Sequence, residues 1–139
     1  MKDFVFERRI NYYETDKMGI VHHSNYIRFL EEARCHMLDK FEIPYSKIEE
    51  CGVQIPVLGV SCEYKHHVGY DDIICINCKI KEFTGVRMTV SYVVTKKDSG
   101  ELVMNAETKH CFTNKNLRPC NLKKYYPKAF EVLTSLVVD

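Results

Sequence analysis

The sequence predicts an α+β fold, in which one long helix packs against a curved antiparallel sheet of about five strands. Between residues 26 and 41 apolar side chains recur every three or four positions, as they do on one face of a helix. Three later segments, 73–81, 87–95 and 102–112, instead alternate with the period of two that is typical of strands. No linker, repeat or low-complexity tract separates the two halves, so we expect a single domain over residues 1–139.

The first half of the chain is expected to contain one short strand and two helices. Residues 4–10 form the strand. The long helix should begin at Ser24 or Asn25, both good N-cap residues, and run for about 17 residues, or about 25 Å. Pro44 disfavours helical geometry at the residue before it, so the helix should end there, and a second, short helix can follow from Pro44 to near Gly52.

The second half is expected to form four strands, of which 57–64 is the first. The joints "FTG" and "KDSG" between the later strands are short and end in glycine, as hairpin turns do, so neighbouring strands should be antiparallel. The C-terminal run "KKYYPKAFEVLTSLVVD" contains an apolar patch. The sequence does not decide whether this patch packs on the sheet or on a partner.

Composition argues against several classes of protein. The net charge of +1 offers no basic field for nucleic acid, and no run of about 18 apolar residues predicts a membrane span. The N-terminus "MKDFVFERR" lacks the apolar core of a secretory signal, so we expect a cytoplasmic protein. The chain contains neither a glycine-rich phosphate motif nor a G-x-S-x-G elbow, so neither a nucleotide cofactor nor a serine hydrolase is expected.

The seven cysteines are expected to be free thiols in a reducing compartment. Cys75 and Cys78 form a C-x-x-C pair, but residues three apart on a strand point to opposite faces, and no second pair completes a zinc site. His66 and His67 are adjacent without a suitably spaced third ligand. We therefore expect no metal site.

The stretch "YYETDKMGIVHHSNYIRFLEEAR" places an acid, a glycine and two histidines directly before the long helix. The first turn of a helix carries unpaired N–H groups and a partial positive charge, which polarise a carbonyl placed against them. Asp16 can reach a carbonyl carbon or a water beside that end, and Gly19 permits close approach of a substrate. Such an arrangement suits a thioester, which is already an activated acyl group. An aspartate before a helix is also typical of a turn, and His23 can contribute either its imidazole or only its backbone N–H.

The same stretch resembles the signature of the hotdog-fold thioesterases. It is similar to the 4-hydroxybenzoyl-CoA thioesterase-like family, and within it to the short bacterial acyl-CoA thioesterases. The residues that carry the resemblance are Tyr13, Glu14, Thr15, Asp16, Gly19, Ile20, Val21, His23, Asn25, Tyr26, Arg28 and Phe29. "EYKHHVGYDD" and "LRPCNL" match the family more loosely.

The resemblance implies catalytic roles for Asp16 and His23, with Tyr13 or Tyr12 as a third member. The spacing between tyrosine and aspartate is one residue shorter here than in many relatives, which leaves both tyrosines open. His22 replaces an aromatic residue that is common in the family. No cofactor is implied, because coenzyme A is part of the substrate.

The resemblance also implies a hydrolase of acyl-CoA thioesters whose sheets join edge to edge in a homodimer, often doubled to a homotetramer. Uncovered sheet edges independently favour association. Active sites would be shared between subunits, and the acyl carrier could be coenzyme A or an acyl carrier protein. The residues expected to bind substrate are Gly19, Val21, His22, Gly59, Val60, Ser61 and Arg87. A hydratase or dehydratase on the same fold, and a non-catalytic acyl-CoA-binding protein, are the alternatives.

Overall fold

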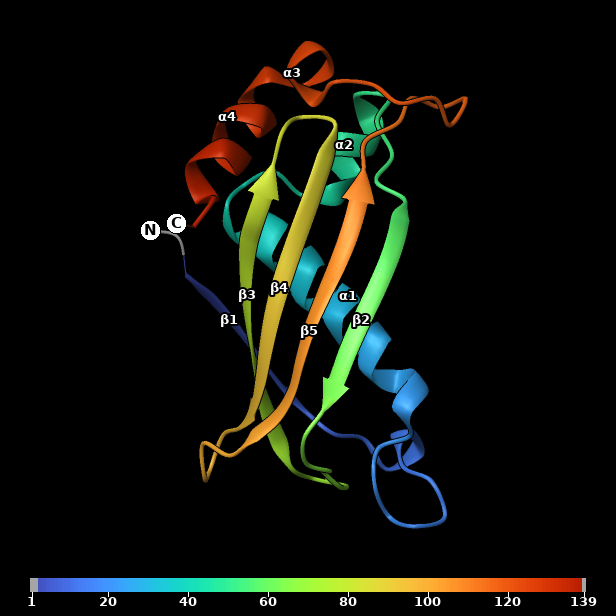
Figure 1. Cartoon of the computed structure of the whole chain (residues 1–139), viewed down its shortest axis with the longest axis vertical. Coiled ribbons are helices and arrows are strands. Elements are labelled where there is room, and N and C mark those ends of the chain that lie inside the picture. The colour runs from blue at the N-terminus through green and yellow to red at the C-terminus, as the bar shows by residue number, and fades with distance from the viewer. Residues whose placement is uncertain (1–2, 139) are drawn as a thin grey trace.

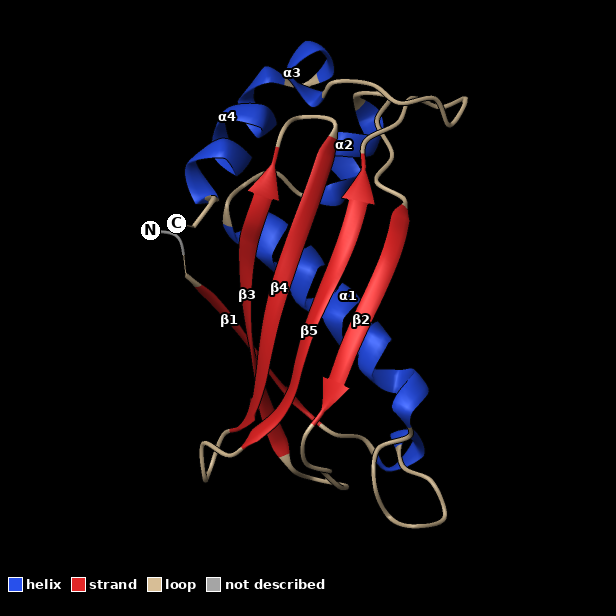
Figure 2. Ribbon diagram, in the orientation of Figure 1, coloured by secondary structure: helices blue, strands red, loops and turns tan. Residues whose placement is uncertain are grey.

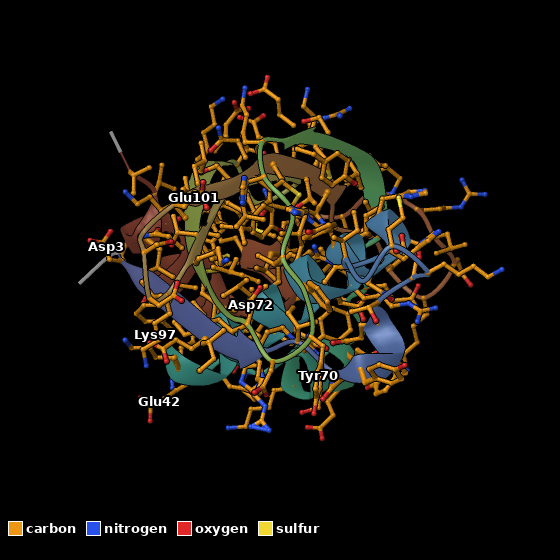
Figure 3. The ribbon with its side chains drawn as sticks, turned by 90° about the horizontal axis from the view of Figure 1, so that it is seen from below. Asp3, Glu42, Tyr70, Asp72, Lys97 and Glu101 are labelled. Atoms are coloured by element: carbon orange, nitrogen blue, oxygen red, sulfur yellow. The ribbon has the colours of Figure 1, made fainter. Side chains whose placement is uncertain are left out.

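The computed structural model describes residues 3–138 and shows one five-stranded antiparallel sheet that wraps around a long helix, α1 (Figures 1 and 2). The strands lie in the order β1-β3-β4-β5-β2. Figure 3, which looks at the molecule from below, shows how strongly the sheet curves around the core. The elements are β1 (Phe4–Arg9), η1 (Tyr12–Glu14), α1 (His23–Lys40), α2 (Tyr45–Glu50), β2 (Val57–Tyr64), β3 (Ile73–Phe83), β4 (Arg87–Lys96), β5 (Leu102–Cys111), α3 (Leu122–Tyr125) and α4 (Pro127–Leu136).

Helix α1 forms where the apolar period predicted it, but its N-cap is His22 and not Ser24 or Asn25. The imidazole Nδ1 of His22 accepts a hydrogen bond from the Ser24 N–H at 3.3 Å, and the His22 carbonyl accepts one from the Asn25 N–H at 2.9 Å. A histidine therefore takes the role that a shorter polar side chain usually plays at this position. The helix ends before Pro44, as predicted, and Pro44 is the N-cap of α2.

The apolar face of α1 packs against the inward face of the sheet. Residues that alternate along β3 and β4 are fully or almost fully buried there, which confirms the period of two predicted for both strands. Cys78 is buried on this face whereas Cys75 lies on the other, so the C-x-x-C pair is split as expected. All seven cysteines lie within residues 3–138, and none of them forms a disulfide.

The C-terminal apolar patch packs on the chain's own sheet. Ala129, Leu133 and Leu136 of α4 are buried, and the Val138 N–H donates to the carbonyl of Ile80 in β3 at 3.0 Å. Helices α3 and α4 therefore cover one end of the sheet, beside the turn between β3 and β4 (Figure 1). Throughout residues 3–138, every helix is too short or too polar to cross a membrane.

Candidate active site

A tight loop connects η1 to α1 and carries most of the predicted site residues. Thr15 and Val21 pair across its neck, and within it the Asp16 N–H donates to Ile20 O while the Gly19 N–H donates to Asp16 O, both at 2.9 Å. Gly19 has a φ of +79°, which a residue with a Cβ adopts only under strain. The loop therefore closes on itself and delivers the chain directly to the start of α1.

Asp16 is half-buried, and one of its carboxylate oxygens is fixed by the loop. The Met18 N–H donates to Asp16 Oδ1 at 2.8 Å, which is the local turn bond typical of aspartate. Within residues 3–138 no donor binds Oδ2. The side chain is thus oriented by the turn but keeps one oxygen free for chemistry, so the turn role and a catalytic role are compatible.

The first turn of α1 leaves a backbone donor available beside this loop. The His22 N–H donates to Glu14 O at 3.0 Å, and the N–H groups of Ser24 and Asn25 are both taken by His22. Between residues 3 and 138, nothing accepts a hydrogen bond from the His23 N–H. The imidazoles of His22 and His23 stack with ring centroids 4.3 Å apart and are both exposed.

A buried ion pair holds this end of α1, and sequence reasoning did not identify it. Arg8 of β1 donates to both carboxylate oxygens of Glu14, at 2.8 and 3.0 Å, and its Nε donates to Glu32 at 2.7 Å. The guanidinium also lies 4.0 Å from the centroid of the Phe29 ring. The Asn25 side-chain amide donates to the Glu14 carbonyl at 2.9 Å. Strand β1, the loop and the helix are thereby tied together at Glu14.

Two tyrosines precede the loop, and both point largely into solvent. Tyr13 is 80% exposed, and its hydroxyl accepts from the Asn11 side-chain amide at 3.3 Å. Tyr12 is 75% exposed and meets the ring of Tyr70 edge-on, at 5.6 Å between centroids.

The remaining predicted residues lie toward the other end of the molecule. Gly59, Val60 and Ser61 belong to β2, which is the edge strand beside β5, and a bulge lies between Val57 and Gly59. Arg87 begins β4 and pairs with Cys111, at the same end of the sheet as Val57. The opposite end of β2 approaches the start of α1, where the rings of Tyr64 and Tyr26 are 5.4 Å apart. An eight-residue strand is about 25 Å long, and Arg87 and Asp16 lie at opposite ends of β2. Within one chain, these two residues are therefore far apart.

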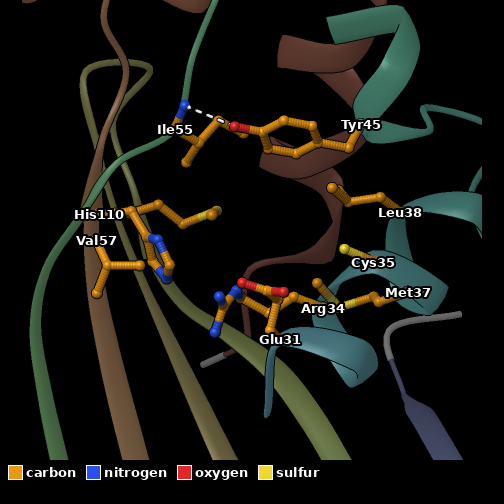
Figure 4. Close-up of a pocket in the computed structure, with 10 residues that line it drawn as sticks. Glu31, Arg34, Cys35, Met37, Leu38, Tyr45, Ile55, Val57 and His110 are labelled. Atoms are coloured by element: carbon orange, nitrogen blue, oxygen red, sulfur yellow. Dashed lines mark hydrogen bonds between the residues drawn. The ribbon is translucent and has the colours of Figure 1, made fainter. Parts of the chain in front are cut away.

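A cavity of about 330 Å³ lies at the Val57 end of β2, between the sheet and the helices (Figure 4). Figure 4 shows His110 on the sheet side and Glu31 and Arg34 on the helix side. Neither Asp16 nor His23 lines this cavity. The other lining residues are Cys35, Met37, Leu38, Tyr45, Ile55, Val57 and Met88.

A chain of polar side chains runs from α1 into the sheet behind the cavity wall. Arg34 Nη1 donates to the Tyr92 hydroxyl at 3.1 Å, which lies 2.6 Å from Thr108 Oγ1, and Thr108 Oγ1 lies 2.8 Å from His110 Nε2. His110 Nδ1 is buried, and no residue between 3 and 138 is hydrogen-bonded to it. Burial raises the pKa of Tyr92 to about 12, and burial together with the charge of Arg34 lowers the pKa of His110 to about 4.

Sequence reasoning overlooked this chain, although part of the signal was available. Thr108 and His110 continue the alternation by which Met104 and Ala106 face the core. The pattern therefore predicts that these two polar side chains also face the core. Within residues 3–138, no group of three or more His, Cys, Asp or Glu side chains is arranged to hold a metal ion. His66 instead contacts Glu101 at 3.1 Å.

Comparisons with known proteins match almost the whole chain. A profile of the thioesterase-like superfamily matches residues 10–133. A crystal structure of a hypothetical protein from Aquifex aeolicus is 40% identical, with a TM-score of 0.85, and the match covers 94% of this chain and 98% of that one. The structure of DHNA-CoA thioesterase from Staphylococcus aureus is 26% identical, with a TM-score of 0.92 and coverage of 98% and 91%. The acyl-CoA thioester hydrolase YbgC of Escherichia coli O157:H7 is 29% identical over 99 residues, which are 71% of this chain and 67% of that protein.

Proposed function

The chain belongs to the thioesterase-like superfamily and has its hotdog fold, and from that premise we propose that it hydrolyses acyl-CoA thioesters to a free acid and coenzyme A. Both named relatives described above are thioester hydrolases by name. No cofactor takes part in the proposed reaction, because the only added reactant is water.

One observation carries the mechanism: the Asp16 carboxylate is fixed by the Met18 N–H, keeps Oδ2 free, and stands directly before the N-terminus of α1. In the proposed reaction the thioester carbonyl oxygen lies against the His23 N–H, where the helix end stabilises the negative charge that develops. Asp16 then acts as a base toward water, or attacks the carbonyl carbon itself. Gly19 keeps side-chain bulk away from this approach.

The histidines and Tyr13 are assigned supporting roles. The His23 imidazole, stacked on His22, would orient the attacking water or the carboxylate, while its backbone N–H binds the oxyanion. Val21 and His22 would line the approach to the carbonyl. Tyr13 is exposed in the single chain, which suits a residue that is covered only when a second subunit is present.

We further propose a homodimer in which the β2 strands of two subunits pair edge to edge. Among residues 3–138, strand β2 pairs only with β5, and Val57, Leu58, Val60 and Tyr64 are 40–55% exposed along it. A two-fold axis through the middle of β2 would place the Val57 end of one strand beside the Tyr64 end of the other. The dimer would then double to the homotetramer that the resemblance implies.

Such a dimer would assemble each active site from both chains. The Asp16 loop of one subunit would face the cavity and Arg87 of the other, with Gly59, Val60 and Ser61 between them. Arg87 is an exposed cation and would meet the phosphates of coenzyme A or of an acyl carrier protein. The proposed location is the cytoplasm, where the seven thiols would stay reduced.

The proposal is tested by a thiol-release screen across short, long and aromatic acyl-CoAs, followed by Asp16→Asn. The variant should retain its circular dichroism spectrum and melting temperature but lose on the order of 10²- to 10⁴-fold in kcat, because a positioned base contributes about that much. Asp98→Asn, in the exposed turn between β4 and β5, is the matched control and should be fully active. Equal turnover by parent and Asp16→Asn would refute the assignment.

The same screen separates the alternative functions. A hydratase or dehydratase would yield products with altered double bonds and release no thiol. A protein that only binds acyl-CoA would do so without any turnover.

A further inference from the structure

We propose that the end of the molecule formed by the loop 114–121 and helix α3 is a membrane-docking surface. Its lysines and arginine bind the headgroups of anionic lipids, and Leu117 inserts between those headgroups. The inference does not depend on the proposed hydrolysis, and it rests on the distribution of charge along the chain and on the conformation of one exposed leucine. Figure 1 shows the loop and α3 at the same end of the molecule, where β5 stops.

Positive charge is concentrated at this end, although the chain as a whole is almost neutral. The net charge is +1, yet no acidic residue occurs between Glu107 and Glu131. Lys81 and Lys97, elsewhere on the sheet, each pair with a glutamate, at 2.7 and 3.0 Å. The basic residues of the loop, of α3 and of the start of α4 are instead exposed and form no salt bridge within residues 3–138; they are Lys115, Arg118, Lys123, Lys124 and Lys128. Such a cluster of unpaired cations attracts an anionic lipid surface.

Leu117 is presented to solvent by a turn that leucine does not favour. Its φ is +60°, a region that bulky residues rarely adopt, and it is 67% exposed. The Leu117 N–H donates to Asn114 O at 3.0 Å. The Asn114 side-chain oxygen accepts from the N–H groups of Asn116 and Arg118, at 2.9 and 3.2 Å. The turn therefore holds an apolar side chain in water against both its backbone preference and the hydrophobic effect, which indicates a contact made outside the chain.

A lipid bilayer is the partner that fits this combination best. The loop projects from the end of the molecule, so it presents a tip to its surroundings (Figure 1). Leu117 stands between Lys115 and Arg118 in the sequence of this tip, and Tyr125 of α3 is 36% exposed nearby in the chain. Peripheral proteins bind anionic bilayers by such an arrangement, in which apolar and tyrosine side chains enter the interface and cations meet the headgroups. A small soluble anion would use the cations but would leave Leu117 in water.

The first test measures binding of the purified protein to vesicles by flotation. Vesicles of phosphatidylcholine with about 30% phosphatidylglycerol, in about 100 mM NaCl, should bind the protein at least about 10-fold more tightly than phosphatidylcholine alone. Replacing both lysines of α3, as K123Q/K124Q, should weaken binding to the anionic vesicles by about 10-fold or more, because each lysine contributes to the attraction. The matched control is K96Q/K97Q, which removes two charges at the opposite end of β4 and should bind as the parent does.

A second test separates docking from a structural role for Leu117. Glycine adopts a positive φ without strain, so the melting temperature of Leu117→Gly should be unchanged or higher. Its affinity for the anionic vesicles should nevertheless fall by about 10-fold, because the inserted apolar side chain is gone. Leu117→Met keeps an apolar side chain on the same turn and should retain the affinity of the parent.

Failure of the parent to bind the anionic vesicles would overturn the inference, as would equal binding by the parent and Leu117→Gly. Release of the bound protein by an excess of free coenzyme A at constant ionic strength would also overturn it, because the cations would then form a nucleotide-phosphate site. Retention on immobilised acyl carrier protein without vesicle binding, lost in K123Q/K124Q, would assign the surface to an acidic protein and reject the bilayer. None of these readouts involves thiol release, so the proposed hydrolysis stands or falls separately.

Discussion

At the scale of single residues, two polar groups are held inside the protein by different means. Arg8 and Glu14 form a charged pair whose side chains are 12% and 7% exposed, and it supports the loop that carries Asp16. His110 is as deeply buried but neutral, and it ends a hydrogen-bond chain that leads to the cavity. The protein should therefore lose stability when one member of the Arg8–Glu14 pair is replaced, and when the pH falls far enough for His110 to take up a proton.

Arg8→Met should lower the free energy of unfolding by about 3 kcal/mol, because it leaves the buried Glu14 carboxylate without its cation. Urea denaturation would measure the loss. Arg9→Met is the matched control: Arg9 pairs with Asp71 at 2.8 Å, but both side chains are more than half exposed, so the cost should stay below about 1 kcal/mol. Similar losses for the two variants would show that the Arg8 pair does not support the helix start.

His110 should make stability depend on pH between about 4 and 6.5. Burial and the charge of Arg34 lower the pKa of its imidazole to about 4 in the folded chain, from the ordinary value of 6.5 in the unfolded one. The unfolded state binds more protons in this window, so stability is complete above pH 6.5 and is lost as the pH falls toward 4. Between pH 7.5 and 5 the loss should be roughly 2 kcal/mol.

Urea unfolding of the parent and of His110→Gln at these two pH values isolates this effect, because all other titratable groups are common to both proteins. The variant should lose about 2 kcal/mol less than the parent on acidification. Parallel losses would contradict the assignment.

At the scale of elements, the C-terminal helices approach the sheet closely at the backbone of Gly85. Gly85, in the turn between β3 and β4, accepts a hydrogen bond from the Leu122 N–H through its carbonyl, at 2.9 Å. Its φ is +94°, and an added Cβ would lie 2.5 Å from Asn121 Oδ1 and 2.8 Å from Phe130 Cε1. The turn thus has to be glycine both for its backbone conformation and for the approach of α3 and α4.

Gly85→Ala should therefore destabilise the protein more than Gly100→Ala. Both glycines have positive φ, but a Cβ at Gly100 would meet no atom within 4 Å. The strain of the backbone is common to both variants, and overpacking against Asn121 and Phe130 adds about 1–3 kcal/mol for Gly85 alone. Thermal denaturation of the two variants measures the difference, and equal melting temperatures would show that α3 and α4 move aside without cost.

At the scale of the whole molecule, β2 determines how the two groups of site residues can meet. The Asp16 loop lies near the Tyr64 end of this strand, whereas the cavity and Arg87 lie near its Val57 end. A single chain keeps them apart, and an antiparallel pairing of two β2 edges would bring each group to the other. Assembly and catalysis should then be lost together.

Val60→Lys should weaken the proposed dimer by on the order of 100-fold, because the two introduced ammonium groups would lie near each other beside the two-fold axis. Light scattering after size exclusion would detect the monomer, and thiol release should fall with the dimer fraction. Val93→Lys is the control, since Val93 is similarly exposed, at 44% against 40%, but belongs to the central strand β4. A monomeric parent with full activity would refute the shared site.

Local pattern was sufficient to predict α1, α2, the five strands and the loop that carries Asp16, but it did not predict η1 or the C-terminal helices α3 and α4. The period of α1, the alternation along β3 and β4, and the glycine-ended turns are set by neighbouring residues, and the structure confirms each of them. The error at the start of α1 is also local, because a histidine acts as the N-cap where Ser24 or Asn25 was expected.

The tertiary structure alone decided which distant residues meet. Arg34 and Tyr92 are 58 positions apart, and Arg8 and Glu32 are 24 apart, so no period or spacing relates them. Three further features also depend on tertiary structure and could not be predicted from local pattern. They are the order of the strands, the packing of α4 on the chain's own sheet, and the buried His110 Nδ1 that lacks a hydrogen-bond partner within residues 3–138. Sequence determines local conformation through neighbouring backbone and side-chain preferences, whereas such pairings depend on how the sheet closes around α1, which is a property of the whole folded chain.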